Sequence, residues 1–157
     1  MRNLSKADIA ILEANFTLLP QQLKILREQV SQDDLTRKVL LEFPDGNSVE
    51  TVLMRHDYGY SVCVSSQVGC DMGCAFCASG LSGCIRNLTA AEILAQVYIF
   101  NSMLVGEGKQ VSRIVVMGSG EPMLNFDAVI GALQFLHREN TPVSYTHLRA
   151  HETELHL

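Results

Sequence analysis

The sequence has no long hydrophobic run and no excess of positive charge. No apolar stretch approaches the ~18 residues that a membrane-spanning helix needs, and no hydrophobic segment of a signal peptide follows Met1. We therefore expect a protein without a membrane partner. The net charge of −5 gives no overall basic field of the kind that attracts nucleic acid, although a local basic patch is compatible with it.

The cysteine content does not fit a disulfide scaffold. The chain has 5 cysteines, an odd number, and four of them lie between Cys63 and Cys77. A framework of disulfides normally has an even number of cysteines, whereas a tight cluster indicates metal chemistry in a reducing compartment. We therefore expect a cytoplasmic protein.

Three of these cysteines, Cys70, Cys74 and Cys77, form a C-x3-C-x2-C array. This spacing puts three thiolates on one short loop, where they can hold an iron–sulfur cluster, and such clusters usually have four cysteine ligands. Three local ligands would leave one iron open, as catalytic metal sites do.

Other interpretations of the array are a structural zinc site that lacks a fourth ligand, or buried free thiols. Zinc sites usually show two C-x2-C pairs, and the chain has one such pair. Cys84 follows the array, and it is either a fourth ligand or a small apolar core residue.

The first third of the chain predicts a short helix followed by strands. Ser5 and Asp8 form a capping pair at the start of the helix. Apolar patterns and a turn with proline, glycine and asparagine then predict a small antiparallel β unit, with strands at 23–30, 37–43 and 48–54 and the turn at 44–47.

Residues 61–140 alternate between strand and helix patterns. Strands are predicted at 61–66 and 111–117, and helices are predicted to begin at Thr89 and Asn125. The order β-loop-α-β-loop-α is typical of an α/β parallel sheet or barrel, in which chemistry lies on loops after the strands. The cysteine loop and a glycine-rich loop at 118–122 both occupy that position, so we expect them to face one crevice. The helix positions that we expect to be buried are Ile93, Leu94, Val97, Phe100, Leu104, Val129, Ile130, Leu133 and Leu136.

The last segment, 143–157, departs from this pattern. A third parallel strand should be apolar here, but the segment holds three of the 5 histidines. His147 and His151 have the spacing of half a zinc site. We favour another interpretation, because the segment resembles the translation of a sequencing-library adapter and would then be a non-native tail.

Several motifs in order resemble one enzyme family. The cysteine array, with Phe76 before its last cysteine, is similar to that of the radical S-adenosylmethionine (SAM) superfamily. The sequence around the array resembles the RNA adenine C2-methyltransferases of the RlmN/Cfr family, and Glu121-Pro122 favours the RlmN branch. The resemblance covers residues 3–140 and rests on the segments 63–70, 73–79, 86–90 and 117–122 together with Asn125.

The resemblance implies the N-terminal part of a partial (β/α) radical-SAM barrel, preceded by a short helix and a small antiparallel β unit. Residues 1–55 would be a remnant of an N-terminal accessory region, 56–142 the first β/α units of the core, and 143–157 the non-native tail. It also implies that the chain is truncated at both ends, so we expect it to be inactive alone.

The resemblance further implies two cofactors. Cys70, Cys74 and Cys77 would ligate a [4Fe-4S] cluster whose open iron binds SAM. Gly120 and Glu121 match the SAM-contacting pair of the family, because a glycine lets the backbone approach a ligand and a carboxylate accepts hydrogen bonds from a cationic amino group. Without the resemblance, this pair would be a plain turn with a solvated glutamate.

Two further positions match catalytic residues of the family. Glu50 matches a glutamate that lies at the adenine and acts as a base. Cys63 matches a cysteine that resolves a methyl-cysteine intermediate by forming a disulfide with it. Taken alone, Glu50 would be a solvated strand residue and Cys63 a buried one. The methyl-carrying cysteine of the family lies beyond Asn140 and is missing from this chain.

The implied activity is methylation of C2 of adenine in 23S rRNA, with transfer RNA as a further candidate, by a monomer that takes electrons from a flavodoxin or ferredoxin. Arg55, His56, Arg86 and Lys109 are either phosphate contacts or ordinary solvated side chains. Open alternatives are another radical SAM enzyme and a non-catalytic iron–sulfur or zinc module. The RNA that is modified, and C2 or C8 as the target, also stay open.

Overall fold

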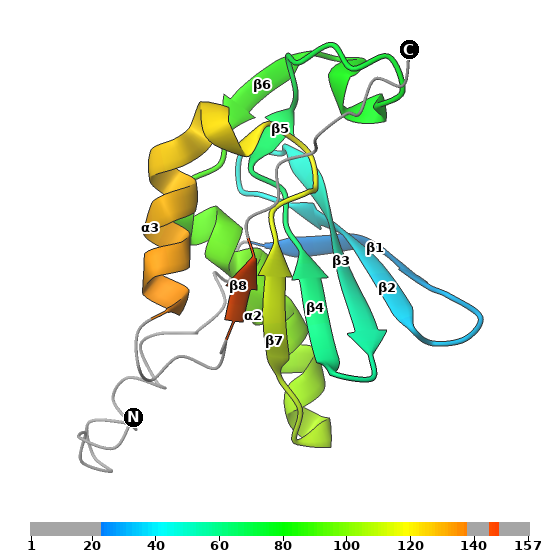
Figure 1. Ribbon diagram of the computed structural model, residues 1–157. Coiled ribbons are helices and arrows are strands. Elements are labelled where there is room, and N and C mark those ends of the chain that lie inside the picture. The colour runs from blue at the N-terminus through cyan, green and yellow to red at the C-terminus, as the bar shows by residue number, and fades with distance from the viewer. Residues whose placement is uncertain (1–22, 138–144, 148–157) are drawn as a thin grey trace, which may run out of the picture.

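The computed structural model describes residues 23–137 and the backbone of 145–147 (Figure 1). The helix predicted from Ser5 and most of the predicted tail lie outside these residues. The elements are, in chain order, β1 (Lys24–Val30), β2 (Thr36–Glu42), β3 (Ser48–His56), β4 (Gly59–Cys63), β5 (Gln67–Gly69), the 3-10 turn η1 (Ala78–Gly80), β6 (Cys84–Asn87), α2 (Ala90–Leu104), η2 (Val105–Glu107), β7 (Val111–Val115), η3 (Pro122–Asn125), α3 (Phe126–Leu136) and β8 (Tyr145–His147).

One sheet of the order β1-β2-β3-β4-β7-β8 runs through the molecule. The first four strands pair antiparallel, and β7 pairs parallel with β4. The predicted antiparallel unit is therefore present, and the pairing of β3 with β4 makes it continuous with the strands of the predicted barrel. A smaller sheet of β5 and β6 was not predicted.

The turn between β2 and β3 forms as its residues predict. The Asn47 backbone N–H donates to Asp45 Oδ1 at 3.0 Å, and Gly46 takes a φ of +83°. An aspartate that accepts from the residue two positions on, followed by a glycine with positive φ, is a turn that closes through local chemistry alone. The β2–β3 hairpin is therefore confirmed.

The crossover from β4 to β7 is made by α2, whose start was predicted from its capping box. Thr89 Oγ1 accepts from the Glu92 backbone N–H at 3.2 Å, and Glu92 Oε2 accepts from the Thr89 N–H at 2.7 Å. Each side chain satisfies a backbone donor that the first helical turn leaves unpaired. None of the helices in the described ranges has the length and hydropathy to cross a bilayer.

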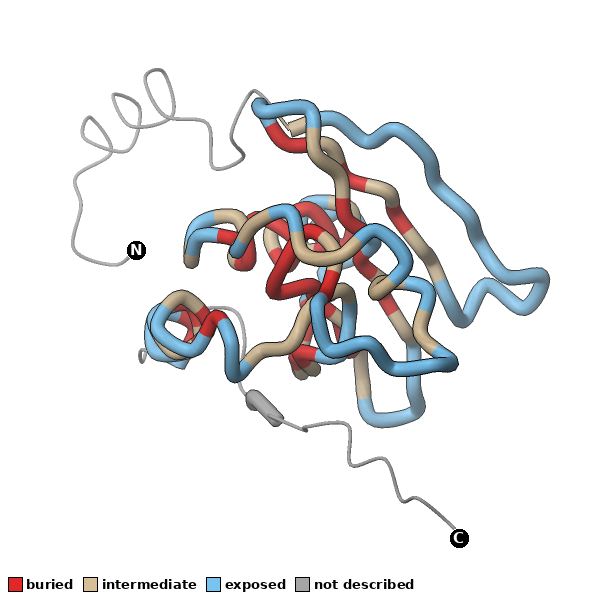
Figure 2. The backbone as a smooth tube through the Cα atoms, turned by 90° about the horizontal axis from the view of Figure 1, so that it is seen from above, coloured by how far each residue is buried: buried red, intermediate tan, exposed pale blue. Residues whose placement is uncertain are grey.

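The core lies between the sheet and the helices, since α2 packs against β7, and α3 packs against α2 (Figure 1). Along β3, Val49, Thr51 and Leu53 are buried, whereas Glu50 on the alternate face is exposed. Most of the predicted helix positions are fully buried, and Leu94, Ile130 and Leu133 are half-buried. Figure 2 shows the buried segments at the centre, with β1 and its turn to β2 projecting as an exposed arm.

Two differences from the predicted strands concern the ends of the sheet. The strand predicted at 61–66 ends at Cys63, because residues 64–67 turn to follow the glycine-rich loop. Tyr145–His147 adds a short parallel strand beside β7 within the segment predicted as a tail. Backbone pairing of three residues requires no particular side chains, so this strand does not bear on the origin of the segment.

Candidate functional site

Two loops meet where the parallel strands β4 and β7 end. The backbone N–H of Gly118 donates to Val64 O at 3.0 Å, and the N–H groups of Ser66 and Gln67 both donate to Ser119 O, at 2.9 and 3.1 Å. Segment 64–67 leads directly into the cysteine loop, and 118–121 is the glycine-rich loop. The glycine-rich loop thus packs on the segment that leads through β5 into the cysteine loop, at the edge of the sheet where we expected both loops.

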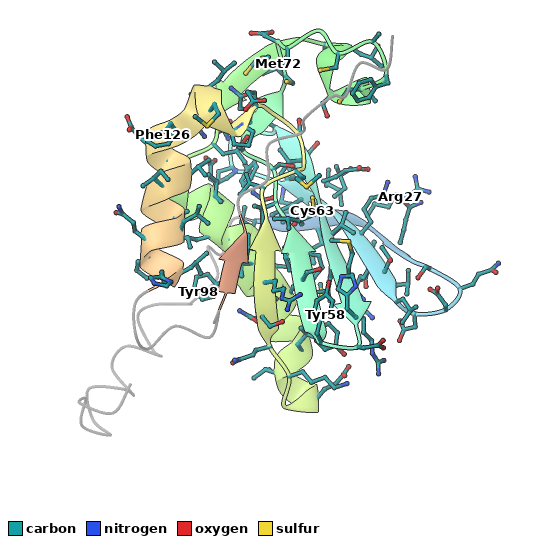
Figure 3. The ribbon with its side chains drawn as sticks, viewed as in Figure 1. Arg27, Tyr58, Cys63, Met72, Tyr98 and Phe126 are labelled. Atoms are coloured by element: carbon teal, nitrogen blue, oxygen red, sulfur yellow. The ribbon has the colours of Figure 1, made fainter. Side chains whose placement is uncertain are left out.

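The three cysteines of the array share the cysteine loop between β5 and η1. Cys70 is buried, Cys77 is half-buried and Cys74 is exposed, and all three are free thiols. Within the described residues, no three His, Cys, Asp or Glu side chains already converge on a common point. The donor set nevertheless fits an iron–sulfur cluster, because three soft thiol ligands lie on one loop. Figure 3 shows this loop, marked by Met72, beyond the end of the sheet at which Cys63 lies.

Cys84 lies beside this array rather than within it. It pairs with Gly69 across the β5–β6 ladder, and its backbone N–H donates to Asp71 Oδ1 at 2.6 Å. Desolvation, together with the nearby Asp71 and Cys70, raises the pKa of the Cys84 thiol. Its half-buried position on β6, outside the short loop that holds the other three thiols, favours Cys84 as a packing residue.

Gly120 and Glu121 lie in the contact between the two loops. Gly120 has a φ of +100°, a conformation that glycine adopts without strain. The Glu121 backbone N–H donates to Gln67 Oε1 at 2.8 Å, and its side-chain Oε1 accepts from the Met123 N–H at 3.1 Å, which caps η3. The glutamate is half-buried and locally anchored, unlike a freely solvated turn residue.

Glu50 and Cys63 lie on the same face of the sheet, opposite the helices. Cys63 pairs with Val52, so Glu50 is its diagonal neighbour on β3, and such neighbours are typically ~7–8 Å apart. The Glu50 side chain is 57% exposed, and its carboxylate forms an ion pair with Lys38 Nζ at 2.9 Å. Burial raises the pKa of the half-buried Cys63 thiol, and a hydrogen bond from the Met117 backbone acts in the opposite direction. Cys63 is therefore a protonated thiol near neutral pH in this state.

Buried amide side chains support the site, and most of them were not predicted. Gln96 is fully buried on α2, where its side chain both accepts from the Ser65 N–H at 2.8 Å and donates to Ser65 O at 3.0 Å. Asn125 Nδ2 donates to Ser66 O at 2.8 Å and to Leu88 O at 2.7 Å. A glutamine between Ile93 and Val97 on a buried helix face was the available sequence signal, since buried polar groups almost always have partners.

The four basic residues considered as phosphate contacts do not gather at the site. Arg55 lines a small cavity of about 60 Å³ at the other end of the sheet, and Lys109 forms an ion pair with Glu107 near that end. His56 bonds to Ser61 Oγ at 2.8 Å and stacks on Tyr58. These three side chains are engaged away from the two loops.

Arg86 is a structural clamp. Its Nε donates to Asp45 Oδ2 at 2.5 Å, and its two terminal nitrogens donate to the Glu92 carboxylate at 2.8 and 3.0 Å. The guanidinium therefore joins the β2–β3 turn, strand β6 and the start of α2. A bidentate arginine–carboxylate pair has a fixed geometry that favours such a role.

This clamp should make the stability of the chain sensitive to acid. Hydrogen bonds from Arg86 and Asn47 hold the pKa of Asp45 well below its ordinary value. Burial acts to raise the pKa of Glu92, but hydrogen bonds from Arg86 and Thr89 outweigh it and lower the pKa. On acidification the unfolded state then binds more protons than the folded state, so stability falls as the pH drops below the ordinary carboxylate values of ~4.

We expect urea unfolding at pH 3 to 7 to show this loss below about pH 4–5. Arg86→Gln should reduce this loss of stability at low pH and should lower the stability at pH 7. Arg27→Gln removes the same charge from an exposed position on β1, and its stability should fall at low pH as much as that of the unaltered chain. Equal profiles for the Arg86 and Arg27 variants would contradict the clamp.

Comparison with known proteins gives relatives for most of the chain. No protein-family model matches the sequence. The chain is 49% identical over 140 residues to the probable dual-specificity RNA methyltransferase RlmN of Clostridium perfringens, which covers 88% of this chain and 39% of that protein. It is 48% identical over 142 residues to the protein of the same description from Streptococcus thermophilus, which covers 89% of this chain and 36% of that protein.

A solved structure agrees with the sequence relatives. The crystal structure of a radical SAM methyltransferase from Sphaerobacter thermophilus superimposes with a TM-score of 0.75 at 41% identity, and the match covers 89% of this chain and 40% of that one. The predicted α/β class and partial barrel are thereby confirmed. By sequence and by fold, the chain is similar over most of its length to RNA methyltransferases named RlmN and to a radical SAM methyltransferase, and it spans about two fifths of the length of the relatives that it matches.

Proposed function

We propose that the chain is the radical-generating segment of an RNA methyltransferase that modifies C2 of adenine in 23S rRNA, and in transfer RNA as a second substrate. The observation that carries this proposal is the contact of the Gly120-Glu121 loop with residues 64–67, which lead through β5 into the cysteine loop, at the ends of the parallel strands. Segment 64–67, which contacts the Gly120-Glu121 loop, follows Cys63 directly at the end of β4, so the proposal takes the groups for cluster, SAM and thiol chemistry from connected parts of the chain.

In this proposal, Cys70, Cys74 and Cys77 hold a [4Fe-4S] cluster through three thiolates. The loop is exposed at Cys74 and Phe76, which suits an approaching electron donor such as a flavodoxin or ferredoxin. When bound, the cluster with its open iron supplies the electron that cleaves SAM into methionine and a 5′-deoxyadenosyl radical.

The Gly120-Glu121 loop would bind the methionine end of SAM. The Glu121 backbone is fixed by Gln67, so its carboxylate starts from a defined position. A carboxylate accepts hydrogen bonds from an ammonium group more strongly than neutral acceptors do. Gly120 has no side chain, so ligand atoms can approach the backbone there.

Glu50 and Cys63 would act on the RNA. Glu50 is a base candidate because its carboxylate is accessible, and Lys38 fixes it on the open face of the sheet. Cys63 would act as a resolving thiol on the thioether that joins a partner cysteine to the adenine: its sulfur would bond to the partner sulfur, the S–C bond would break, and the released carbon would take the electron pair and a proton to become the methyl group. We assign that partner to a cysteine outside the 5 of this chain, so the chain alone should not methylate RNA.

Anaerobic reconstitution of the chain with iron and sulfide tests the proposal. We expect ~4 irons per chain. After chemical reduction we expect formation of 5′-deoxyadenosine from SAM, measured by mass spectrometry. Binding of a single zinc ion, with no cleavage of SAM, would instead identify a non-catalytic metal module.

The RNA part of the proposal needs its own measurement. A version of the chain extended through the rest of its reading frame should transfer a labelled methyl group to adenine C2 of 23S rRNA fragments. Labelling at C8, or only of a small-molecule acceptor, would contradict this part and leave the SAM cleavage unaffected.

A further inference from the structure

Gln67 lies between the two loops of the site. It is the first residue of β5, three positions before Cys70, and its side chain is buried at 3% exposure. A glutamine at such a depth needs partners for both its oxygen and its nitrogen.

Both halves of the Gln67 amide are bonded to groups from distant parts of the chain. Its Oε1 accepts from the Glu121 backbone N–H at 2.8 Å, and its Nε2 donates to Asn87 Oδ1 at 2.7 Å. Its own backbone N–H donates to Ser119 O at 3.1 Å. One side chain thus joins the strand before the cysteine array, the strand after it and the glycine-rich loop.

The packing of Gly120 gives an independent sign of how closely the loops fit. A Cβ added at Gly120 would lie 2.5 Å from Gln67 Cβ and 2.7 Å from the Gln67 backbone nitrogen. Distances below ~3 Å require one group to move, and the backbone nitrogen cannot rotate away. The glycine-rich loop is therefore seated directly on Gln67.

From these contacts we infer that Gln67 is a positioning residue, which fixes the Gly120-Glu121 loop at a set distance from the cysteine loop and so sets the affinity for SAM. The inference rests on the proposed function. A ligand that bridges an iron and a protein loop needs both anchors within about 0.5 Å of the productive geometry. In this role Gln67 acts through the backbone of Glu121.

A matched pair of variants separates this role from general stabilisation. Gln67→Met keeps the length of the side chain and removes both hydrogen bonds. Asn101→Leu is the control, because Asn101 Oδ1 likewise accepts from a backbone N–H, that of Val111 at 2.7 Å, but at the far end of β7. Gln67→Glu is the conservative variant, since it keeps an oxygen for the Glu121 N–H.

Hydrogen exchange of the cluster-free chain is the first measurement. The Glu121 amide should exchange about 10-fold faster in Gln67→Met, because this variant loses the hydrogen bond to the Glu121 N–H. The increase should be smaller in Gln67→Glu, which keeps an oxygen acceptor for that N–H. The Asn101→Leu variant should leave the Glu121 amide protected.

Titration of the reconstituted chain with SAM is the second measurement. Gln67→Met should retain the iron content of the unaltered chain and bind SAM about 10-fold more weakly, whereas Asn101→Leu should bind it normally. Unchanged SAM affinity in Gln67→Met, or an equal loss in both variants, would overturn the inference. If the unaltered chain takes up iron but neither binds nor cleaves SAM, the proposed function fails and the inference fails with it.

Discussion

Replacement of Cys74 by serine is expected to abolish assembly of the cluster. Cys74 is the exposed middle member of the C-x3-C-x2-C array, and no neighbouring thiol on the loop can replace it without displacing Cys70 or Cys77. Serine is nearly isosteric, but its hydroxyl stays protonated and is a poor ligand for iron. After anaerobic reconstitution, we expect the iron content to fall from ~4 to less than ~1 per chain, with SAM cleavage at background.

Cys84→Ser provides the matched control. Cys84 lies next to the array on β6, its pKa is raised by desolvation and by nearby Asp71 and Cys70, and we have assigned it a packing role. Iron content and SAM cleavage should therefore stay at the level of the unaltered chain. If iron is lost in Cys84→Ser and retained in Cys74→Ser, the ligand set is wrong. Because Cys74 is exposed, its replacement should leave the urea unfolding curve of the cluster-free chain unchanged.

Alanine at Gly120 should cause a large loss of stability. Gly120 has a φ of +100°, and the new Cβ would lie 2.5 Å from Gln67 Cβ. Backbone strain of ~1–3 kcal/mol and overpacking of ~1–3 kcal/mol add to a loss of about 2–6 kcal/mol in the free energy of unfolding. The midpoint of urea unfolding measures it, because the midpoint shifts in proportion to stability when the slope is constant.

Gly46→Ala separates the two contributions. Gly46 also has a positive φ, +83°, but a Cβ there would meet no atom within 4 Å. The free energy of unfolding of Gly46→Ala should therefore fall only by the conformational contribution, about 1–2 kcal/mol. An equal loss at both glycines would show that the glycine-rich loop can move away from Gln67, contrary to the close contact that we describe. In the reconstituted chain, Gly120→Ala should also weaken SAM binding, whereas Gly46→Ala should not.

Local sequence signals predicted most of the elements correctly. The capping box of Thr89 and Glu92 placed the start of α2, and the turn around Gly46 placed the β2–β3 hairpin. These features depend on residues two or three positions apart, so the information is present in a short window of sequence.

The end of β4 and the small β5–β6 sheet were not predictable in this way. Residues 64–67 read as the continuation of an apolar strand, but their backbone groups pair with residues 115–119, which lie about fifty positions further along the chain. No periodicity in a short window reports a partner at that separation. For the same reason the sequence did not show that the antiparallel unit and the parallel strands share one sheet.

The candidate site also combines features that a short stretch of sequence predicts with features that depend on contacts between distant residues. The sequence by itself determined the spacing of Cys70, Cys74 and Cys77, a local property of one loop, and from it the ligand chemistry could be predicted. Only the tertiary structure decided that Gln67 bonds the Glu121 backbone, that Glu50 and Cys63 share one face of the sheet, and that Arg86 is a structural clamp. These facts depend on strand order and register, which bring together residues far apart in the chain, and buried hydrogen bonds then favour one arrangement over others.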